Sequence, residues 1–245
     1  MTITKILLIC HGGKGGVGKS YTALSSVERL LAESIKIALV EADPTQPDLA
    51  IRYSGDPDIK VGALSLNRAG DGENAIAAFG EWLEREAAEH VVVNLPGGAG
   101  ETIDEHGDQI RDLADAMGYR LVVTYNLEKN RVATDEMMNS FETGLMSHVS
   151  PENQFIILPA FKGQPESFEW MTHHSRPQVL HAGTREIVFP ALSNRGALKK
   201  FEDSRGRVSA LIEHPQEGWF IMDRSSVFRW YKAALAAITP IFGGE

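Results

Sequence analysis

A glycine-rich loop directly after a short apolar run is the feature that most constrains the fold of this chain. The run at residues 6–10 has the continuous hydrophobicity of a strand buried on both faces, and it is too short for a signal-peptide core. The loop that follows reads Gly13-Lys14-Gly15-Gly16-Val17-Gly18-Lys19-Ser20. A helical pattern begins directly after it. A strand, a glycine loop and a helix in this order are typical of a loop that wraps phosphate groups.

Each residue type in this loop has a physical reason to be there. Glycines let backbone N–H groups approach phosphates closely, and the start of the helix adds donors and a favourable dipole. Lys19 is placed to reach the β- and γ-phosphates of a nucleotide, and the Ser20 hydroxyl is placed to ligate Mg²⁺. A turn that binds nothing would leave both residues unexplained. The predicted nucleotide-binding residues are Gly13, Lys14, Gly15, Gly16, Val17, Gly18, Lys19, Ser20 and Tyr21.

Alternating strand and helix patterns predict an α/β fold. Further apolar runs are predicted strands at residues 37–40, 91–93, 121–123, 155–158 and 187–189. Helical patterns lie between most of these runs. The alternation predicts a doubly wound, mostly parallel sheet with helices on both faces, as in P-loop nucleotide-binding proteins. Segment 43–72 is rich in Asp, Pro and Gly and is expected to hold loops, with at most a short helix. No linker or repeat is visible, so we expect a single domain over residues 1–245.

Composition and charge exclude several classes of protein. Hydrophobic residues make up 43% of the 245 and charged residues 23%, which is ordinary for a globular chain and excludes a disordered or fibrous one. No apolar run approaches the ~20 residues that cross a bilayer. The single cysteine, Cys10, excludes an internal disulfide framework and favours a reducing, cytoplasmic setting. The net charge of −9 does not attract nucleic acid or anionic membranes overall, although a local basic patch could.

The second lysine of the loop makes the resemblance more specific. Lys14 stands directly before Gly15, and Lys-Gly-Gly-Val-Gly-Lys-Ser resembles the deviant Walker A signature of the ParA/MinD superfamily of P-loop ATPases. The resemblance implies ATP and Mg²⁺ as cofactors and a homodimer that encloses two ATP molecules. It also implies that Lys14 reaches the nucleotide of the facing subunit, where a cation could neutralise charge that develops during transfer. Lys14 and Lys19 are therefore candidate catalytic residues.

Two strand ends carry the other candidate residues. The stretch Glu41-Ala42-Asp43-Pro44-Thr45-Gln46 resembles switch I of ParA proteins, which implies that Asp43 contacts the Mg²⁺ water shell and orients the attacking water. Asp43 is thus a candidate catalytic residue and, with Ser20, a candidate metal residue; Asp-Pro as a simple turn initiator is the alternative.

The third predicted strand departs from the family pattern. It ends in Asn94 where the family has an aspartate, although the Pro and Gly residues that follow still resemble a switch II loop. An amide brings no negative charge, so we expect a weak ATPase at most, with Asp43 or Glu41 as the acids that could compensate. No asparagine follows the strand at 155–158, and ATP over GTP therefore rests on the resemblance alone.

The later part of the chain resembles one particular branch of this superfamily. Residues 163–171 and 187–192 resemble the plasmid conjugal-transfer TraL-like and MobD-like branch, which implies a partner protein in plasmid transfer or partition. The C-terminal apolar spacing predicts a helix that packs on its own domain rather than on a membrane. Five cations lie close together in the sequence, at Arg195, Lys199, Lys200, Arg205 and Arg207. A DNA-binding patch and a solvated helix face are equally compatible with this group. We expect His173, His174 and His181 to be surface residues rather than metal ligands.

Three functions remain open at this stage. The first is an ATP-dependent switch that dimerises around the nucleotide and hydrolyses it slowly. The second is an ATP-dependent biosynthetic ligase of the related P-loop fold, which would need a substrate pocket beside the γ-phosphate. The third is a module that binds nucleotide and scarcely hydrolyses it, because of Asn94.

Overall fold

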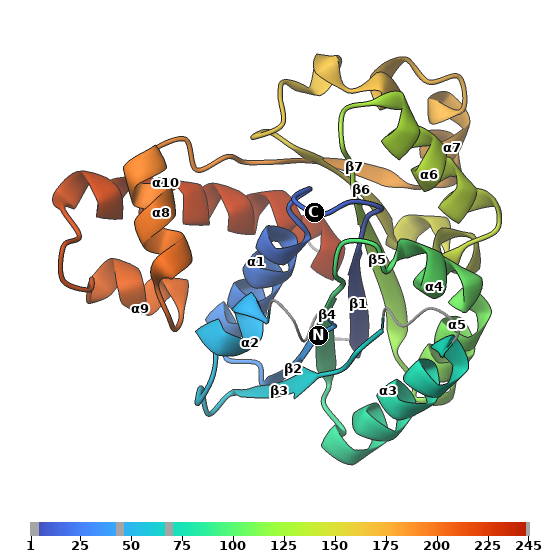
Figure 1. Ribbon diagram of the computed structural model, residues 1–245, viewed down its shortest axis with the longest axis horizontal. Helices are drawn as coiled ribbons and strands as arrows, with labels where there is room; N and C mark the ends of the chain where they lie inside the picture. The colour runs from blue at the N-terminus through green and yellow to red at the C-terminus, as the bar shows by residue number, and fades with distance from the viewer. Residues whose placement is uncertain (1–4, 43–46, 67–70, 244–245) are drawn as a thin grey trace.

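The sheet contains seven strands, all parallel, in the order β3-β2-β4-β1-β5-β6-β7 (Figure 1). The computed structural model describes residues 5–42, 47–66 and 71–243. The strands are β1 Ile6–His11, β2 Ile37–Glu41, β3 Ile59–Ala63, β4 His90–Asn94, β5 Arg120–Asn126, β6 Gln154–Pro159 and β7 Arg185–Phe189. The prediction of a mostly parallel α/β sheet is confirmed.

One strand was not predicted. β3 lies in the segment expected to hold loops, and it forms an edge of the sheet beside β2. Its side chains at Lys60 and Val61 are exposed, so it lacks the continuous apolar run of the central strands. Edge strands are short and polar enough to escape a prediction based on hydrophobic runs. The short helix expected in the same segment is α2, Asp48–Arg52.

Helices cover both faces of the sheet. They are α1 Lys19–Ala32, α2, α3 Gly72–Glu86, α4 Gly100–Glu105, α5 Gly107–Ala116, α6 Arg131–Glu142, α7 Arg176–Ala182, α8 Arg195–Asp203, α9 Val208–Glu213 and α10 Ile221–Ile238. Alternate β1 residues point to opposite faces: Leu7 packs in the core under α3 to α6, and Leu8 packs in the core under α1 and α10. The doubly wound arrangement is therefore confirmed.

The C-terminal helix packs on the rest of the chain, as its spacing predicted. Val227, Trp230, Ala234 and Ile238 are buried in the same core as the α1 residues Leu24 and Val27. In the part of the chain that the structure describes, no helix has both the length and the apolar character needed to cross a bilayer.

The strand order determines where a ligand site can form. The chain winds from β1 toward β3 on one side of the sheet and from β5 toward β7 on the other, so the order reverses next to β1. In sheets of this kind, ligands bind beyond the carboxyl ends of the strands at that reversal. The glycine loop leaves β1 at this point and leads into α1 (Figure 1).

Candidate nucleotide-binding site

The glycine loop is a tight connection between β1 and α1. Gly18 is the residue before the helix and has φ 92°, a left-handed conformation that suits glycine and strains other residues. Its carbonyl oxygen accepts the N–H groups of Tyr21 and Thr22 at 3.0 Å each. Loop and helix therefore join without a side-chain cap, which leaves the first helical N–H groups directed toward the loop.

Lys19 is buried inside this connection. Its side chain is 5% exposed, and its Nζ donates to the carbonyl oxygens of Lys14 at 2.6 Å and Gly12 at 3.3 Å. Burial lowers the pKa of Lys19 to about 8, from its ordinary 10.5. A phosphate beside this amine would restore the charged form and reverse that shift.

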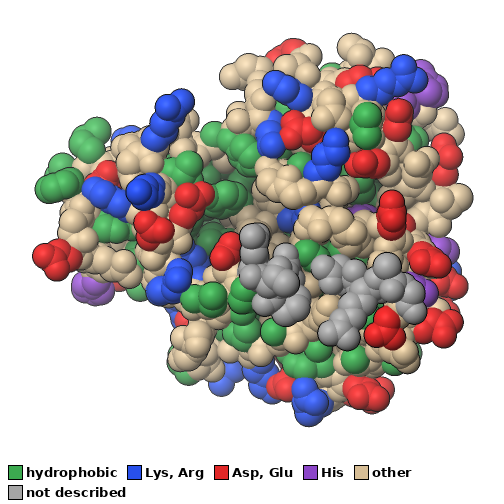
Figure 2. Space-filling model, viewed as in Figure 1, with side chains coloured by type: hydrophobic (Ala, Val, Ile, Leu, Met, Phe, Trp, Pro, Cys, Tyr) green, Lys and Arg blue, Asp and Glu red, His purple; other side chains and the backbone are tan. Residues whose placement is uncertain are grey.

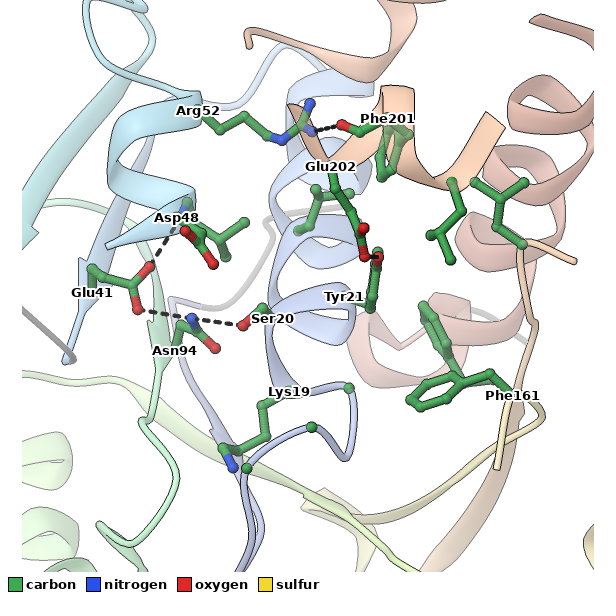
Figure 3. A pocket seen from close by; sticks show the side chains of 18 of the residues that line it. Lys19, Ser20, Tyr21, Glu41, Asp48, Arg52, Asn94, Phe161, Phe201 and Glu202 are labelled. Atoms are coloured by element: carbon green, nitrogen blue, oxygen red, sulfur yellow. Dashed lines mark hydrogen bonds between the residues drawn. The ribbon is translucent and has the colours of Figure 1, made fainter. Parts of the chain in front are cut away.

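The Asn94 side chain at the end of β4 connects Ser20, a predicted metal residue, with Glu41 at the end of β2 (Figure 3). The Asn94 side-chain amide donates to Ser20 Oγ at 3.2 Å and to Glu41 Oε1 at 2.8 Å. Among the described residues, its Oδ1 is buried without a hydrogen-bond partner. Glu41 is fully buried at the end of β2, and its Oε2 accepts the N–H of Leu49 at 3.2 Å. Asp43, the other candidate acid, lies outside the described residues.

The loop after β4 lies directly on the glycine loop. A Cβ on Gly97 would stand 2.8 Å from the backbone N of Gly15, closer than any side chain tolerates. The two backbones therefore touch at this point, and a residue larger than glycine would push them apart. This contact places the segment after Asn94, which was compared with a switch II loop, directly beside the glycine loop.

A cavity of about 700 Å³ opens beside these groups. The side of the cavity next to the glycine loop is formed by Gly15, Gly16, Gly18, Lys19, Ser20 and Tyr21. The remaining predicted residues do not line it: Gly13 and Lys14 are half-buried elsewhere in the loop, and Val17 is buried in the protein. The surface is hollowed between the α8–α10 side of the molecule and the strand ends (Figure 2). This volume lies in the range of small-molecule and cofactor sites.

The far side of the cavity was not predicted from the sequence. It is apolar at Phe161, Pro190 and Leu192, which follow β6 and β7, and charged where α8 approaches α1. There the Tyr21 hydroxyl donates to Glu202 at 2.8 Å, and burial together with this acid raises the pKa of Tyr21. These residues stand far apart in the sequence, so no local signal could have grouped them.

The basic residues near α8 do not form one free patch. Lys200 is bound to Asp223, and Arg207 is bound to Asp56 at 2.6 Å and Asp58 at 2.7 Å. On the face shown in Figure 2, cationic and acidic side chains are interspersed. This arrangement favours the solvated helix face over a DNA patch.

The histidines do not cluster with other metal-binding side chains. His173 stacks on Trp170 and lies beside His174. Within the described ranges, no group of three or more His, Cys, Asp or Glu side chains could hold a metal ion. His174 and His181 are exposed and His173 is half-buried, so the three lie at the surface as expected.

Comparison with known proteins gives distant similarities. The chain is 21% identical over 233 residues to the protein MobD of Acidithiobacillus ferrooxidans, across 95% of this chain and 96% of that protein. None of the models of known protein families matches it.

Solved structures are similar at low sequence identity. A nucleotide-binding protein from Archaeoglobus fulgidus, in complex with ADP, is 12% identical with a TM-score of 0.44, over 81% of this chain and 86% of that one. The signal recognition particle receptor FtsY from Elizabethkingia anophelis is 13% identical with a TM-score of 0.49, over 93% of this chain and 66% of that one. Likenesses of this size assign neither family nor function, and the functional argument rests on the site itself.

Proposed function

We propose that this chain binds ATP with Mg²⁺ at the Gly13–Tyr21 segment and works as a nucleotide-dependent switch. The observation that carries the proposal is the buried Lys19 amine, held by loop carbonyl oxygens at the start of α1. A buried ammonium is costly without an anion. A nucleotide phosphate supplies that anion at a helix N-terminus, where backbone donors and the helix dipole also favour it. In this proposal residues 1–245 are a single nucleotide-binding domain of a cytoplasmic protein.

The residues present fit a magnesium ion next to the phosphates. Mg²⁺ takes hard oxygen ligands, and the Ser20 hydroxyl is such a group. Asn94 Oδ1, buried without a partner among the described residues, is an acceptor available for a metal-bound water. When bound, Mg²⁺ would neutralise charge on the phosphate oxygens. Asp43 keeps its proposed role of orienting the attacking water, and the amide at Asn94 makes slow hydrolysis the expected outcome.

A homodimer is the second part of the proposal. By resemblance to ParA/MinD proteins, Lys14 reaches across to the nucleotide of a facing subunit. Its half-buried side chain lies outside the cavity that its own Lys19 lines, which supports a target other than its own subunit's phosphates. ATP would then shift the population from monomer to dimer and create a surface for a partner. Similarity to MobD over nearly the whole chain supports plasmid mobilisation as the process, with an unidentified protein of that machinery as the partner.

Sedimentation with ATP, with ADP and without nucleotide tests the switch. We expect a monomer without nucleotide or with ADP and a dimer with ATP and Mg²⁺. Fluorescent-nucleotide titration at low protein concentration measures binding separately, and a parallel titration with GTP tests base preference. If the protein binds ATP but its mass distribution is the same with and without ATP, the switch is refuted. The remaining function would then be that of a nucleotide-binding module.

An ATP-dependent ligase is the second candidate function. The observation in its favour is the charged side of the cavity, where Tyr21, Glu202 and Arg205 stand beyond the phosphate loop. A small carboxylate substrate would need a cation such as Arg205 beside the nucleotide. Turnover of ATP that depends on an added metabolite would favour the ligase over the switch.

A further inference from the structure

A buried acid beside the phosphate loop is not explained by the loop itself. Glu41 has 0% of its surface exposed, although it ends β2 at the edge of the cavity. It accepts hydrogen bonds from the Leu49 N–H and from the Asn94 amide. Because burying a carboxylate is expensive even with hydrogen bonds, its place in the site calls for a functional reason.

The strand register brings this acid to the end of β4. Glu41 and Asn94 are partners in the parallel β2–β4 pair, and Asn94 is also the partner of Cys10 in the β1–β4 pair. The amide lies between Glu41 on one side and Ser20, at the start of α1, on the other. It donates to both, at 2.8 Å and 3.2 Å.

The chemistry of the amide matches this position. A single NH₂ group can donate two hydrogen bonds, one to a carboxylate and one to a hydroxyl. A carboxylate at position 94 would instead face Glu41 across the same 2.8 Å with a like charge. Two buried carboxylates at that distance cannot both stay ionised. Glu41 and an acid at position 94 are therefore alternatives, and this chain has the acid on β2.

We infer that Glu41 is the acidic positioning residue of the magnesium site, and that Asn94 is the neutral link between Glu41 and Ser20. The inference rests on the proposed ATP and Mg²⁺ binding. In this arrangement Asn94 orients the Ser20 hydroxyl and keeps Oδ1 for a metal-bound water. Glu41 holds the negative charge one hydrogen bond further away.

An exchange of the two side chains tests this assignment. Glu41→Gln alone removes the charge and leaves an NH₂ group facing a donor, either Leu49 N–H or the Asn94 amide. In the double variant Glu41→Gln/Asn94→Asp, the new amide on β2 accepts from Leu49 N–H and donates to the new carboxylate on β4. That carboxylate can also accept from the Ser20 hydroxyl. The double variant thus restores one charge and its hydrogen bonds to both neighbours, with the acid on β4.

The measurement is the ratio of ATP affinity in Mg²⁺ to ATP affinity in EDTA, by fluorescent-nucleotide titration. We expect Mg²⁺ to tighten ATP binding by about tenfold or more in the parent. We expect a ratio near one in Glu41→Gln and a ratio within about threefold of the parent in the double variant. Glu89→Gln, which removes an exposed charge just before β4, is the control for net charge and should keep the parent ratio.

The outcomes separate this inference from the proposed function. If the parent protein binds ATP neither in Mg²⁺ nor in EDTA, the proposed function itself is refuted. A parent with a clear Mg²⁺ effect that persists in Glu41→Gln overturns the inference and leaves ATP binding intact. If Glu41→Gln fails to fold by circular dichroism, the double variant decides: a parent-like ratio supports the inference, and a ratio near one overturns it.

Discussion

Replacing Lys19 by methionine should stabilise the protein in the absence of nucleotide. The parent keeps a buried ammonium against two carbonyl oxygens, and this burial lowers the pKa of Lys19 to about 8 from 10.5. At 1.36 kcal/mol for each pKa unit, that shift corresponds to about 3 kcal/mol against the folded, charged form. Methionine has a similar length and no charge. Since the two carbonyl oxygens lose a donor, we expect a net gain of about 1–3 kcal/mol in the free energy of unfolding at pH 7.

The pH dependence of this gain is the distinguishing result. Below pH 8, Lys19 is protonated in both the folded and unfolded states, so the full penalty is present. Between pH 8 and 10.5 the folded state releases its proton first, and the parent gains stability relative to Lys19→Met as pH rises. The difference between the two proteins should therefore shrink across this range. Other groups that titrate there cancel in the difference.

Urea unfolding of both proteins at pH 7, 8, 9 and 10, without nucleotide, measures this difference. Lys36→Met, at an exposed lysine after α1, is the control and should show no such pH-dependent gain. Saturating ATP with Mg²⁺ should reverse the order, because ligand at 100 times its Kd stabilises the parent by about 2.7 kcal/mol and the variant far less. A Lys19→Met protein no more stable than the parent at pH 7, with a difference that does not change with pH, would refute the reasoning.

Three further predictions concern Lys14, Asn94 and Arg207. Lys14→Ala should keep the ATP affinity of the monomer within about threefold but abolish ATP-driven dimerisation; titration at low protein concentration and sedimentation of the same variant measure the two, and a variant that dimerises like the parent removes the ParA/MinD assignment. Asn94→Asp should lower the free energy of unfolding by about 1–3 kcal/mol, because the new carboxylate faces Glu41; urea unfolding measures the loss, and a more stable variant would contradict the buried pair. Arg207→Gln should cost about 1 kcal/mol near pH 7. Since Arg207 lowers the pKa of Asp56, the stability from this pair is present above the ordinary Asp range and is lost as pH falls through the lowered pKa; a parent–variant difference that stays constant down to pH 2 would count against it.

Much of the fold could be predicted because its signals are local. Central strands of a parallel sheet are buried on both faces, so β1, β2, β4, β5 and β6 appear as apolar runs. Edge strand β3 was missed, since several of its side chains meet solvent and its sequence carries no such run. The C-terminal helix was correctly assigned to the core from the spacing of its apolar residues.

The candidate site was only half predictable. The glycine loop is a continuous stretch of sequence, and its chemistry depends on neighbours along the chain. Glu41 was noted as an acid at a strand end, but its pairing with Asn94 depends on the strand register. The hydrogen bond between Tyr21 and Glu202 joins residues 181 positions apart, which no spacing rule could indicate.

The sequence by itself determined the glycine loop, the αβ alternation and the absence of an acid at position 94. The tertiary structure decided which acid lies beside Asn94, which residues line the far side of the cavity and which carbonyl oxygens accept from the Lys19 amine. The physical reason lies in the sheet. β4 is inserted between β1 and β2, and only this placement puts Ser20, Asn94 and Glu41 within hydrogen-bond distance. Strand insertion is set by the packing of whole faces against helices, a global property that no short segment of the chain contains.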